Sequence, residues 1–129
     1  MKVAVSSTGQ GQDGGVDPRF GRCPYFLIVD SDTFSSEVVE NTGTASAHGA
    51  GIGAAQLIAS KGVKAVITGH VGPNAYQSLN SVGIKIYTVK AGTIKEAIEA
   101  LAAGRLSQVS EPTSPGHAGG GGRGRRRGV

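Results

Sequence analysis

The order of two kinds of apolar pattern restricts the fold of this chain more than any other feature. Short runs rich in Val, Ile, Ala or Phe at residues 2–6, 25–29 and 37–40 predict three strands early in the sequence. Two further strand patterns, at 63–68 and 84–89, alternate with helical ones. The chain is therefore expected to form three strands, then helix, strand, helix, strand and helix.

Each of the three helical segments carries a start or stop signal. Residues 50–60 repeat apolar side chains at helical spacing, and Gly62 stops the pattern. Pro73 stands where the first residue of a helix is expected, before a second apolar repeat. Thr93 and Glu96 have the spacing of a capping box, so they are expected to open the last helix.

This order favours an α/β fold with a single five-stranded mixed sheet. The second and third strands are close enough in sequence for a hairpin, and crossovers through helices are right-handed in nearly all known proteins. The simplest sheet has the order 3-2-1-4-5, with strand 2 antiparallel and about three helices packed on it. We expect this RNase H-like, three-layer fold to occupy residues 1–106 as one domain, and residues 107–129 to be a disordered tail rich in Gly and Arg.

The net charge of +4 belongs to the tail rather than to the predicted domain. Four of the 13 basic residues are Arg123, Arg125, Arg126 and Arg127, and the remaining nine balance the nine acidic residues. A nucleic-acid-binding face on the folded domain is therefore not supported. Nucleic acid stays open as a partner of the tail alone, because Arg/Gly segments bind it through charge.

Cys23 is the single cysteine, so an internal disulfide is excluded. No apolar run reaches the length of a membrane span, and a strand pattern starts at Val3 without a signal-peptide pattern before it. These features favour a cytoplasmic protein without a membrane partner.

Loops that follow several strands are predicted to meet at one edge of the sheet. They are residues 7–24, 42–50 and 69–73, and open α/β sheets bind ligands at such a carboxyl edge. We predict one binding site there, with Cys23, His48 and His70 as metal ligands. The complete set of predicted site residues is Arg19, Arg22, Cys23, His48, Gly49, Gly51, His70 and Gly72.

These residue types suit an anionic guest that contains metal. Arg gives a fixed positive charge with forked donors, thiolate and imidazole bind metal, and helix N-termini offer free N–H groups. One thiol cannot provide the four ligands of a conventional iron–sulfur or structural zinc site. A preassembled cluster with its own sulfides needs fewer protein ligands, and a homodimer would add a second set.

Simpler interpretations of the same residues stay open. A lone cysteine is often a small buried side chain, although Cys23 lies outside the apolar run and is expected to be exposed in a loop. Arg19 and Arg22 are also placed to pair with Asp13 or Asp17. His48 also fits as a residue near the N-cap of a helix, and His70 as a residue that ends a strand.

Five segments of the sequence are similar to one known family. They are MKVAVSS at 1–7, DPRFGRCPYFLIVD at 17–30, HGAGIGAAQLIASKGVKAVITG at 48–69, GPNAYQSL at 72–79 and GIKIYTV at 83–89. On these segments the chain resembles the dinitrogenase iron–molybdenum cofactor biosynthesis family, of the NifX, NafY and NifB C-terminal type. The resemblance implies an RNase H-like fold that carries iron–molybdenum cofactor, a precursor or a related metal–sulfur cluster between donor and acceptor proteins.

The resemblance also implies a binding protein rather than an enzyme, and a purified chain that can be free of its cluster. It does not imply a part in nitrogen fixation. Members that act there tend to carry His before the Phe-Gly-Arg step, where this chain has Arg19. A His ligand at that position is therefore not expected.

An RNase H-type nuclease is the remaining alternative for such a fold. That chemistry needs several carboxylates around two metal ions, one of them on the first strand. The first strand reads Val-Ala-Val-Ser-Ser and has no acidic residue, and Asp30 is expected at the opposite end of the sheet. The sequence therefore argues against a nuclease.

Overall fold

The computed structural model describes residues 1–45 and 49–113. Within them the chain forms, in order, β1 (Lys2–Ser7), β2 (Tyr25–Asp30), β3 (Ser36–Glu40), the short 3-10 helix η1 (Thr42–Ala45), α1 (Ala50–Ala59), β4 (Ala65–Thr68), α2 (Pro73–Ser81), β5 (Lys85–Thr88) and α3 (Ile94–Ala102). The predicted succession of strands and helices is confirmed, and η1 is an addition that the sequence did not predict. Thr93 and Glu96 form the predicted capping box, with both of its hydrogen bonds present.

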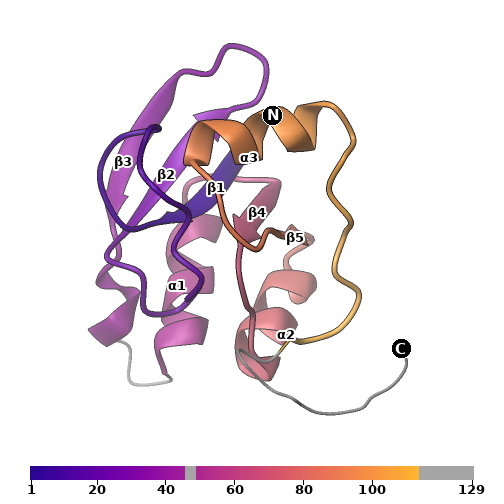
Figure 1. Ribbon diagram of the computed structural model, residues 1–129. Coiled ribbons are helices and arrows are strands. Elements are labelled where there is room, and N and C mark those ends of the chain that lie inside the picture. Colours follow the sequence, from indigo (N-terminus) through magenta and orange to yellow (C-terminus); the bar gives the residue numbers. More distant parts are fainter. Residues whose placement is uncertain (46–48, 114–129) are drawn as a thin grey trace.

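The five strands form one sheet in the order β3-β2-β1-β4-β5 (Figure 1). β1 pairs antiparallel with β2 on one side and parallel with β4 on the other. β2 and β3 form an antiparallel hairpin, and β4 and β5 are parallel. The predicted mixed sheet, with strand 2 antiparallel, is therefore confirmed. Its parallel strands place the chain ends that follow β1 and β4 at one common edge.

Side chains alternate across this sheet and divide the core into two halves. Ala4, Phe26 and Ile28 pack with α1 and α2 on one face. Val3, Val5 and their neighbours pack with α3 on the other. The result is the three-layer arrangement seen in Figure 1. Each fully buried Leu, Ile or Phe side chain stabilises the fold by about 1.5–3 kcal/mol.

The C-terminal segment 107–113 differs from the sequence prediction. It was expected to belong to a disordered tail that starts at residue 107, but it lies along the outer edge of β5. Gln108 forms an antiparallel bridge with Tyr87, and the Val109 N–H donates to the Ile86 carbonyl at 2.7 Å. The sequence did not predict this contact, because backbone groups form it and the side chains of the segment are mostly polar. The described fold therefore ends later than the predicted domain boundary at residue 106.

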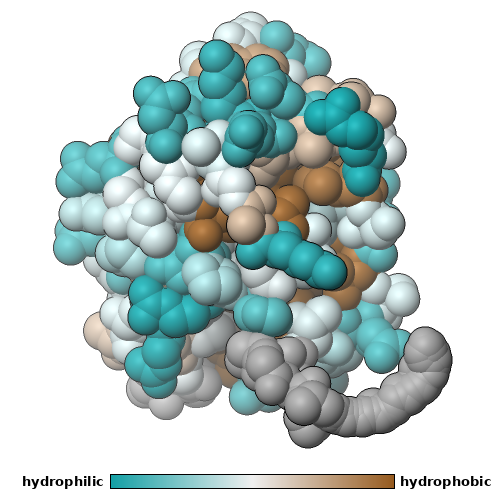
Figure 2. Space-filling model, viewed as in Figure 1, coloured by the Kyte–Doolittle hydropathy of each residue, from teal (hydrophilic) through white to brown (hydrophobic). Residues whose placement is uncertain are grey.

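The lengths of the helices and the polarity of the surface are the last features of the fold. Among residues 1–45 and 49–113, no helix is long and apolar enough to cross a bilayer. On the face drawn in Figure 2, most of the surface is hydrophilic or neutral, and the hydrophobic colour gathers in the middle of the view. The predictions made for His48 and for residues 114–129 lie outside the described residues.

Candidate functional site

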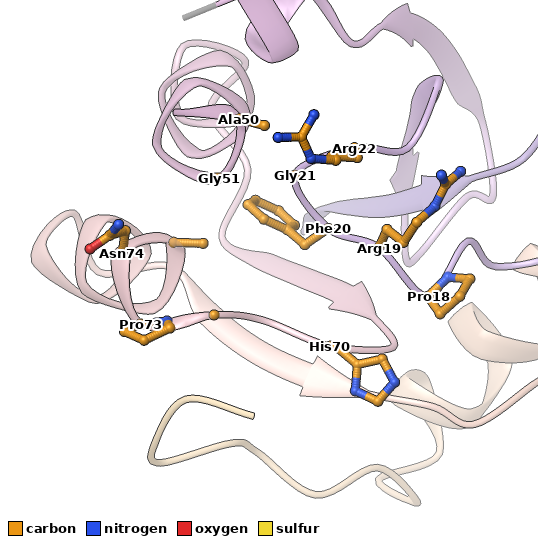
Figure 3. Close-up of a pocket in the computed structure, with 12 residues that line it drawn as sticks. Pro18, Arg19, Phe20, Gly21, Arg22, Ala50, Gly51, His70, Pro73 and Asn74 are labelled. Carbon is orange, nitrogen blue, oxygen red and sulfur yellow. The ribbon is translucent and has the colours of Figure 1, made fainter. Parts of the chain in front are cut away.

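A pocket of about 380 Å³ opens at the carboxyl edge of the sheet, between the N-termini of α1 and α2 (Figure 3). Its lining includes Arg19, Arg22, Gly51, His70 and Gly72, five of the eight predicted site residues. The other lining residues are Pro18, Phe20, Gly21, Ala50, Pro73, Asn74 and Ala75. The structure thus brings together residues from three loops that are far apart in the sequence.

The segment 18–22 forms one wall of this pocket and is hydrogen-bonded to the link between β4 and α2. The His70 N–H donates to the Pro18 carbonyl at 2.8 Å, and His70 also forms a parallel bridge with Arg19. A Cβ on Gly69 would lie only 2.6 Å from the Pro18 Cα. A side chain at residue 69 would therefore push the wall away from the strand end.

Glycines also let the two helices approach this wall and each other. A Cβ on Gly21 would lie 2.8 Å from the backbone nitrogen of Gly51, in the first turn of α1. A Cβ on Gly51 would lie 3.1 Å from the Cβ of Ala75, in the first turn of α2. The N-termini of α1 and α2 converge on the pocket because these positions carry almost no side chain.

Both of these helix N-termini begin at a glycine. The N-cap residues are Gly49 and Gly72, neither first turn contains an acidic residue, and no side chain of the described residues caps either one. The first N–H groups of a helix have no partner inside it and carry partial positive charge. The lining contains no Asp or Glu, so this arrangement favours an anion.

The two predicted arginines have different surroundings. Arg19 is bound to Asp17, with Nε 3.0 Å from Oδ1 and Nη2 2.8 Å from Oδ2. The Asp17 side chain is 2% exposed, and the hydrogen bond from the Arg19 side chain lowers the pKa of Asp17 below its usual value. Among residues 1–45 and 49–113, Arg22 makes no ion pair. Figure 3 shows Arg22 extended toward α1, whereas Arg19 points away from both helices.

Cys23 is buried, and the prediction that it is loop-exposed is wrong. Its exposed fraction is 0%, it does not line the pocket, and its Sγ–H donates to the Phe20 carbonyl at 3.4 Å. Burial raises the pKa of the Cys23 thiol to about 12, and the negative charge of Asp17 adds to this rise. The Asn41 side-chain amide donates a hydrogen bond to the Cys23 carbonyl at 2.8 Å, which ties this residue to the chain that follows β3.

Several residues of this region were not predicted from the sequence. Asn41 is buried and also donates to the Gly21 carbonyl at 3.1 Å, which joins the pocket wall to the chain that follows β3. The ring of Phe20 stands between the two helix N-termini (Figure 3). Pro73 indicated a helix start, and this signal was enough to place Asn74 in the first turn. The positions of Asn41 and Phe20 depend on tertiary contacts, and no local pattern reveals them.

A metal site made of protein ligands alone is absent from the part of the chain that the structure describes. No three His, Cys, Asp or Glu side chains come together there in a way that could hold a metal ion. His70 lines the pocket and is partly exposed. Gly49 caps α1 but does not belong to the lining, and its φ of 107° lies in the region that favours glycine.

The fold and the pocket define a small α/β protein with a cationic hollow at the carboxyl edge of a mixed sheet. A family model described as dinitrogenase iron–molybdenum cofactor matches residues 1–104. The chain belongs to this family.

Solved structures and a curated relative agree with the family assignment. The apo form of the orange protein from Desulfovibrio gigas is 39% identical, with a TM-score of 0.83 over 88% of this chain and 96% of that one. A Thermotoga protein whose name relates it to NifB is 42% identical, with a TM-score of 0.76 over 89% and 98%. The protein MJ0580 of Methanocaldococcus jannaschii is 36% identical over 111 residues, which are 84% of this chain and 91% of the relative.

Proposed function

We propose that this chain binds an anionic metal–sulfur cluster, either iron–molybdenum cofactor or a precursor of that type, in the pocket between α1 and α2. One observation carries the proposal. Two helix N-termini that no described side chain caps meet, together with the Arg22 side chain, around a hollow whose described lining has no carboxylate. Helix ends of this kind attract negative charge, and a guanidinium adds a fixed positive charge with several donors.

The protein ligands of the cluster are few in this proposal. A cluster that carries its own sulfides can be held mainly by charge and N–H donors, and His70 is the lining residue that offers an imidazole to the metal. His48, which precedes the N-cap of α1 in sequence, stays a candidate for a second imidazole. We leave Cys23 out of the ligand set, because a thiol with a pKa of about 12 inside the core does not offer a thiolate.

A carrier fits this site better than a catalyst does. The pocket is open to solvent at the sheet edge, so a guest held by charge can enter and leave, as transfer from a donor protein to an acceptor protein requires. A nuclease needs acidic ligands at this edge. The register instead places Asp30 opposite Lys2, at the other end of β1 and β2.

Metal uptake by the full chain tests the proposal. We would incubate the protein without oxygen with tetrathiomolybdate, the simplest molybdenum–sulfur dianion, and separately with a thiolate-capped iron–sulfur cluster. Molybdenum or iron per chain and the visible absorption spectrum would be measured after gel filtration. We expect about one guest per chain. No uptake of either guest would contradict the proposal.

A pair of matched variants tests the site. Arg22→Gln should weaken binding roughly tenfold, because it removes a charged hydrogen-bond donor. Arg105→Gln removes the same charge from an exposed residue that follows α3 and does not line the pocket. It should therefore leave the affinity nearly unchanged. Equal losses in the two variants would show that binding does not depend on this pocket.

A further inference from the structure

One buried side chain, that of Asn41, bonds the backbone on both sides of Arg22. Its amide nitrogen Nδ2 donates to the Gly21 carbonyl at 3.1 Å and to the Cys23 carbonyl at 2.8 Å. Gly21 and Cys23 are the residues immediately before and after Arg22 in the sequence. Asn41 therefore holds this part of the pocket wall at two points, with Arg22 between them.

The chain around Asn41 keeps this amide in place. Asn41 is 6% exposed, its Oδ1 accepts from the Gly43 N–H at 3.1 Å, and its own N–H donates to the Pro24 carbonyl at 3.0 Å. An Asn amide offers two N–H donors and one acceptor, and here all three have partners. Gly43 belongs to η1, which packs so closely on α1 that a Cβ on Gly43 would lie 2.4 Å from the Ala54 nitrogen. Asn41 thus connects the pocket wall to the helix whose N-terminus faces the pocket.

Arg22 and Arg19 reach their positions in different ways. The Arg19 guanidinium is held by the Asp17 carboxylate. Arg22 is exposed, and its guanidinium makes no ion pair with any of the residues that the structure describes. Its direction toward α1, seen in Figure 3, therefore depends on the backbone from which it extends. Asn41 is the side chain that bonds this backbone.

We propose that Asn41 is a positioning residue for anion binding: it holds the Gly21 and Cys23 carbonyls inside the protein and so directs Arg22 to the guest in the pocket. This inference rests on the proposed function. An arginine on a mobile loop would lose conformational freedom when it contacts the guest. A backbone that is already fixed reduces this cost, which strengthens binding without any new contact.

A double-mutant cycle in the full-length chain tests this role. Asn41→Ala should weaken tetrathiomolybdate binding about tenfold, as Arg22→Gln does. The double variant should bind as weakly as Arg22→Gln alone, within about twofold, because Asn41 acts through a side chain that is already absent. Wild-type affinity in Asn41→Ala would overturn the inference. Losses that multiply in the double variant would also overturn it, because they would mean that Asn41 does not act through Arg22.

Ile98→Val is the matched control for a loss of stability. Asn41→Ala leaves two carbonyls without their donor and is therefore expected to destabilise the fold. Ile98 is fully buried against α3, on the other face of the sheet, so its change to Val lowers stability away from the pocket. This control should bind tetrathiomolybdate like the wild type, and a loss equal to that of Asn41→Ala would overturn the inference. If Asn41→Ala does not fold, Asn41→Ser, which keeps one donor, takes its place in the cycle with an expected loss of about threefold.

The chain without a guest provides a separate test. Nitrogen-15 relaxation of the Arg22 backbone N–H should give an order parameter of about 0.85 in the wild type, as in rigid backbone, and a lower value in Asn41→Ser. A wild-type value below about 0.6 would overturn the inference even if the protein binds its guest. If the wild-type chain takes up no tetrathiomolybdate, the proposed function and this inference fail together. If the wild type binds and Asn41→Ala binds equally well, the inference alone fails.

Discussion

The N-terminus of α3 and the N-termini of α1 and α2 are built in opposite ways. At α3, the Thr93 Oγ1 accepts from the Glu96 N–H at 3.1 Å, and the Glu96 Oε1 accepts from the Thr93 N–H at 2.9 Å. The next two N–H groups, of Ile94 and Lys95, donate to carbonyls of the loop that follows β1, at 2.9 and 3.0 Å. Every donor at this helix end has a partner within the protein.

At α1 and α2, glycines occupy the N-cap positions, and no side chain of the described residues replaces them as a cap. The three helices have similar lengths of ten, nine and nine residues. Helix length therefore does not explain the difference. Relative to glycine, a Ser, Thr, Asp or Asn cap is worth a few tenths of a kcal/mol. Among the described residues, such a cap is missing at the two helix starts that face the pocket. The cap of α3 stabilises that helix, whereas under the proposed function the first N–H groups of α1 and α2 bind the guest.

Giving α2 an acidic cap should have the largest effect. Gly72 has φ of −77° and ψ of 175°, and a Cβ there meets nothing within 4 Å, so Gly72→Asp fits without strain. Its carboxylate would accept from the first turn of α2 and place negative charge beside the pocket. We expect binding of tetrathiomolybdate to fall by roughly 10- to 100-fold, while the free energy of unfolding stays equal or rises by a few tenths of a kcal/mol.

Gly72→Asn is the matched control for this prediction. Asn caps a helix about as well as Asp but adds no charge, so its effect on affinity should be intermediate. Affinity measured by titration and stability measured by urea unfolding would separate the effect of capping from the effect of the added charge. Unchanged affinity in the Asp variant would show that the α2 terminus takes no part in binding.

The free energy of unfolding should depend on alkaline pH, because the loop beside the pocket contains a buried thiol, Cys23, whereas α3 contains none. The pKa of Cys23 is raised to about 12 in the folded protein, whereas an unfolded cysteine titrates near 8.5. The unfolded chain therefore loses this proton first as the pH rises. Stability should fall between these two pKa values, by at most about 1.4 kcal/mol per pH unit.

Cys23→Ala should remove this part of the pH dependence. Urea unfolding at pH 7.5, 8.5 and 9.5 would give the slope for both proteins, and a constant offset from the lost side-chain volume does not affect it. Equal slopes of unfolding free energy against pH in the two proteins would mean that the pKa of Cys23 is the same in the folded and unfolded states. The same variant should retain its guest, and loss of the guest per folded molecule would restore Cys23 as a ligand.

Removing the cap of α3 should affect stability alone. Thr93→Ala deletes the oxygen that accepts from the Glu96 N–H and should cost about 1 kcal/mol of unfolding free energy. The affinity of the folded protein for tetrathiomolybdate should remain that of the wild type. A parallel loss of affinity would show that α3 is coupled to the pocket through the loop that follows β1, which contacts both.

Most of the fold was predictable because it follows from local patterns. Alternating apolar residues, Pro73 and the Thr93–Glu96 capping box were enough to predict the strands, the helices and the sheet order. The segment 107–113 and η1 were not predictable in this way. The first is held by backbone contacts to β5, and the second packs closely on α1, where a Cβ on Gly43 would lie 2.4 Å from the Ala54 nitrogen.

The candidate site was predictable only as a region. Topology brought the correct loops to one edge, and five of the eight predicted residues line the pocket there. The sequence left Asp13 and Asp17 open as partners of both arginines, but it could not show that Arg19 pairs with Asp17 while Arg22 points toward α1. It also could not show that Cys23 is buried and that its carbonyl accepts a hydrogen bond from the Asn41 side chain. Such contacts depend on how the folded chain packs, so no local sequence pattern predicts them.

The smallest effect should come from a single methyl group between α1 and α2. In Gly51→Ala the new Cβ would lie 3.1 Å from the Cβ of Ala75, so the two helix starts must move apart by a few tenths of an ångström. Replacing a helical glycine by alanine favours the helix by about 0.5–1 kcal/mol, and this gain offsets the crowding. We therefore expect near-wild-type stability, and an affinity for tetrathiomolybdate that is two- to threefold weaker because the N–H groups no longer converge on one anion.

The double variant Gly51→Ala with Ala75→Gly moves this methyl group from one helix to the other and removes the crowding. Its affinity, measured by the same titration, should return to the wild-type value, while the free energy of unfolding stays near that of the wild type, because the glycine added to α2 offsets the glycine removed from α1. If both variants bind as tightly as the wild type, the spacing of the two helix starts is unimportant, and the contrast with α3 reduces to the missing caps alone. If the double variant stays weak, the methyl group of Ala75 itself contacts the guest.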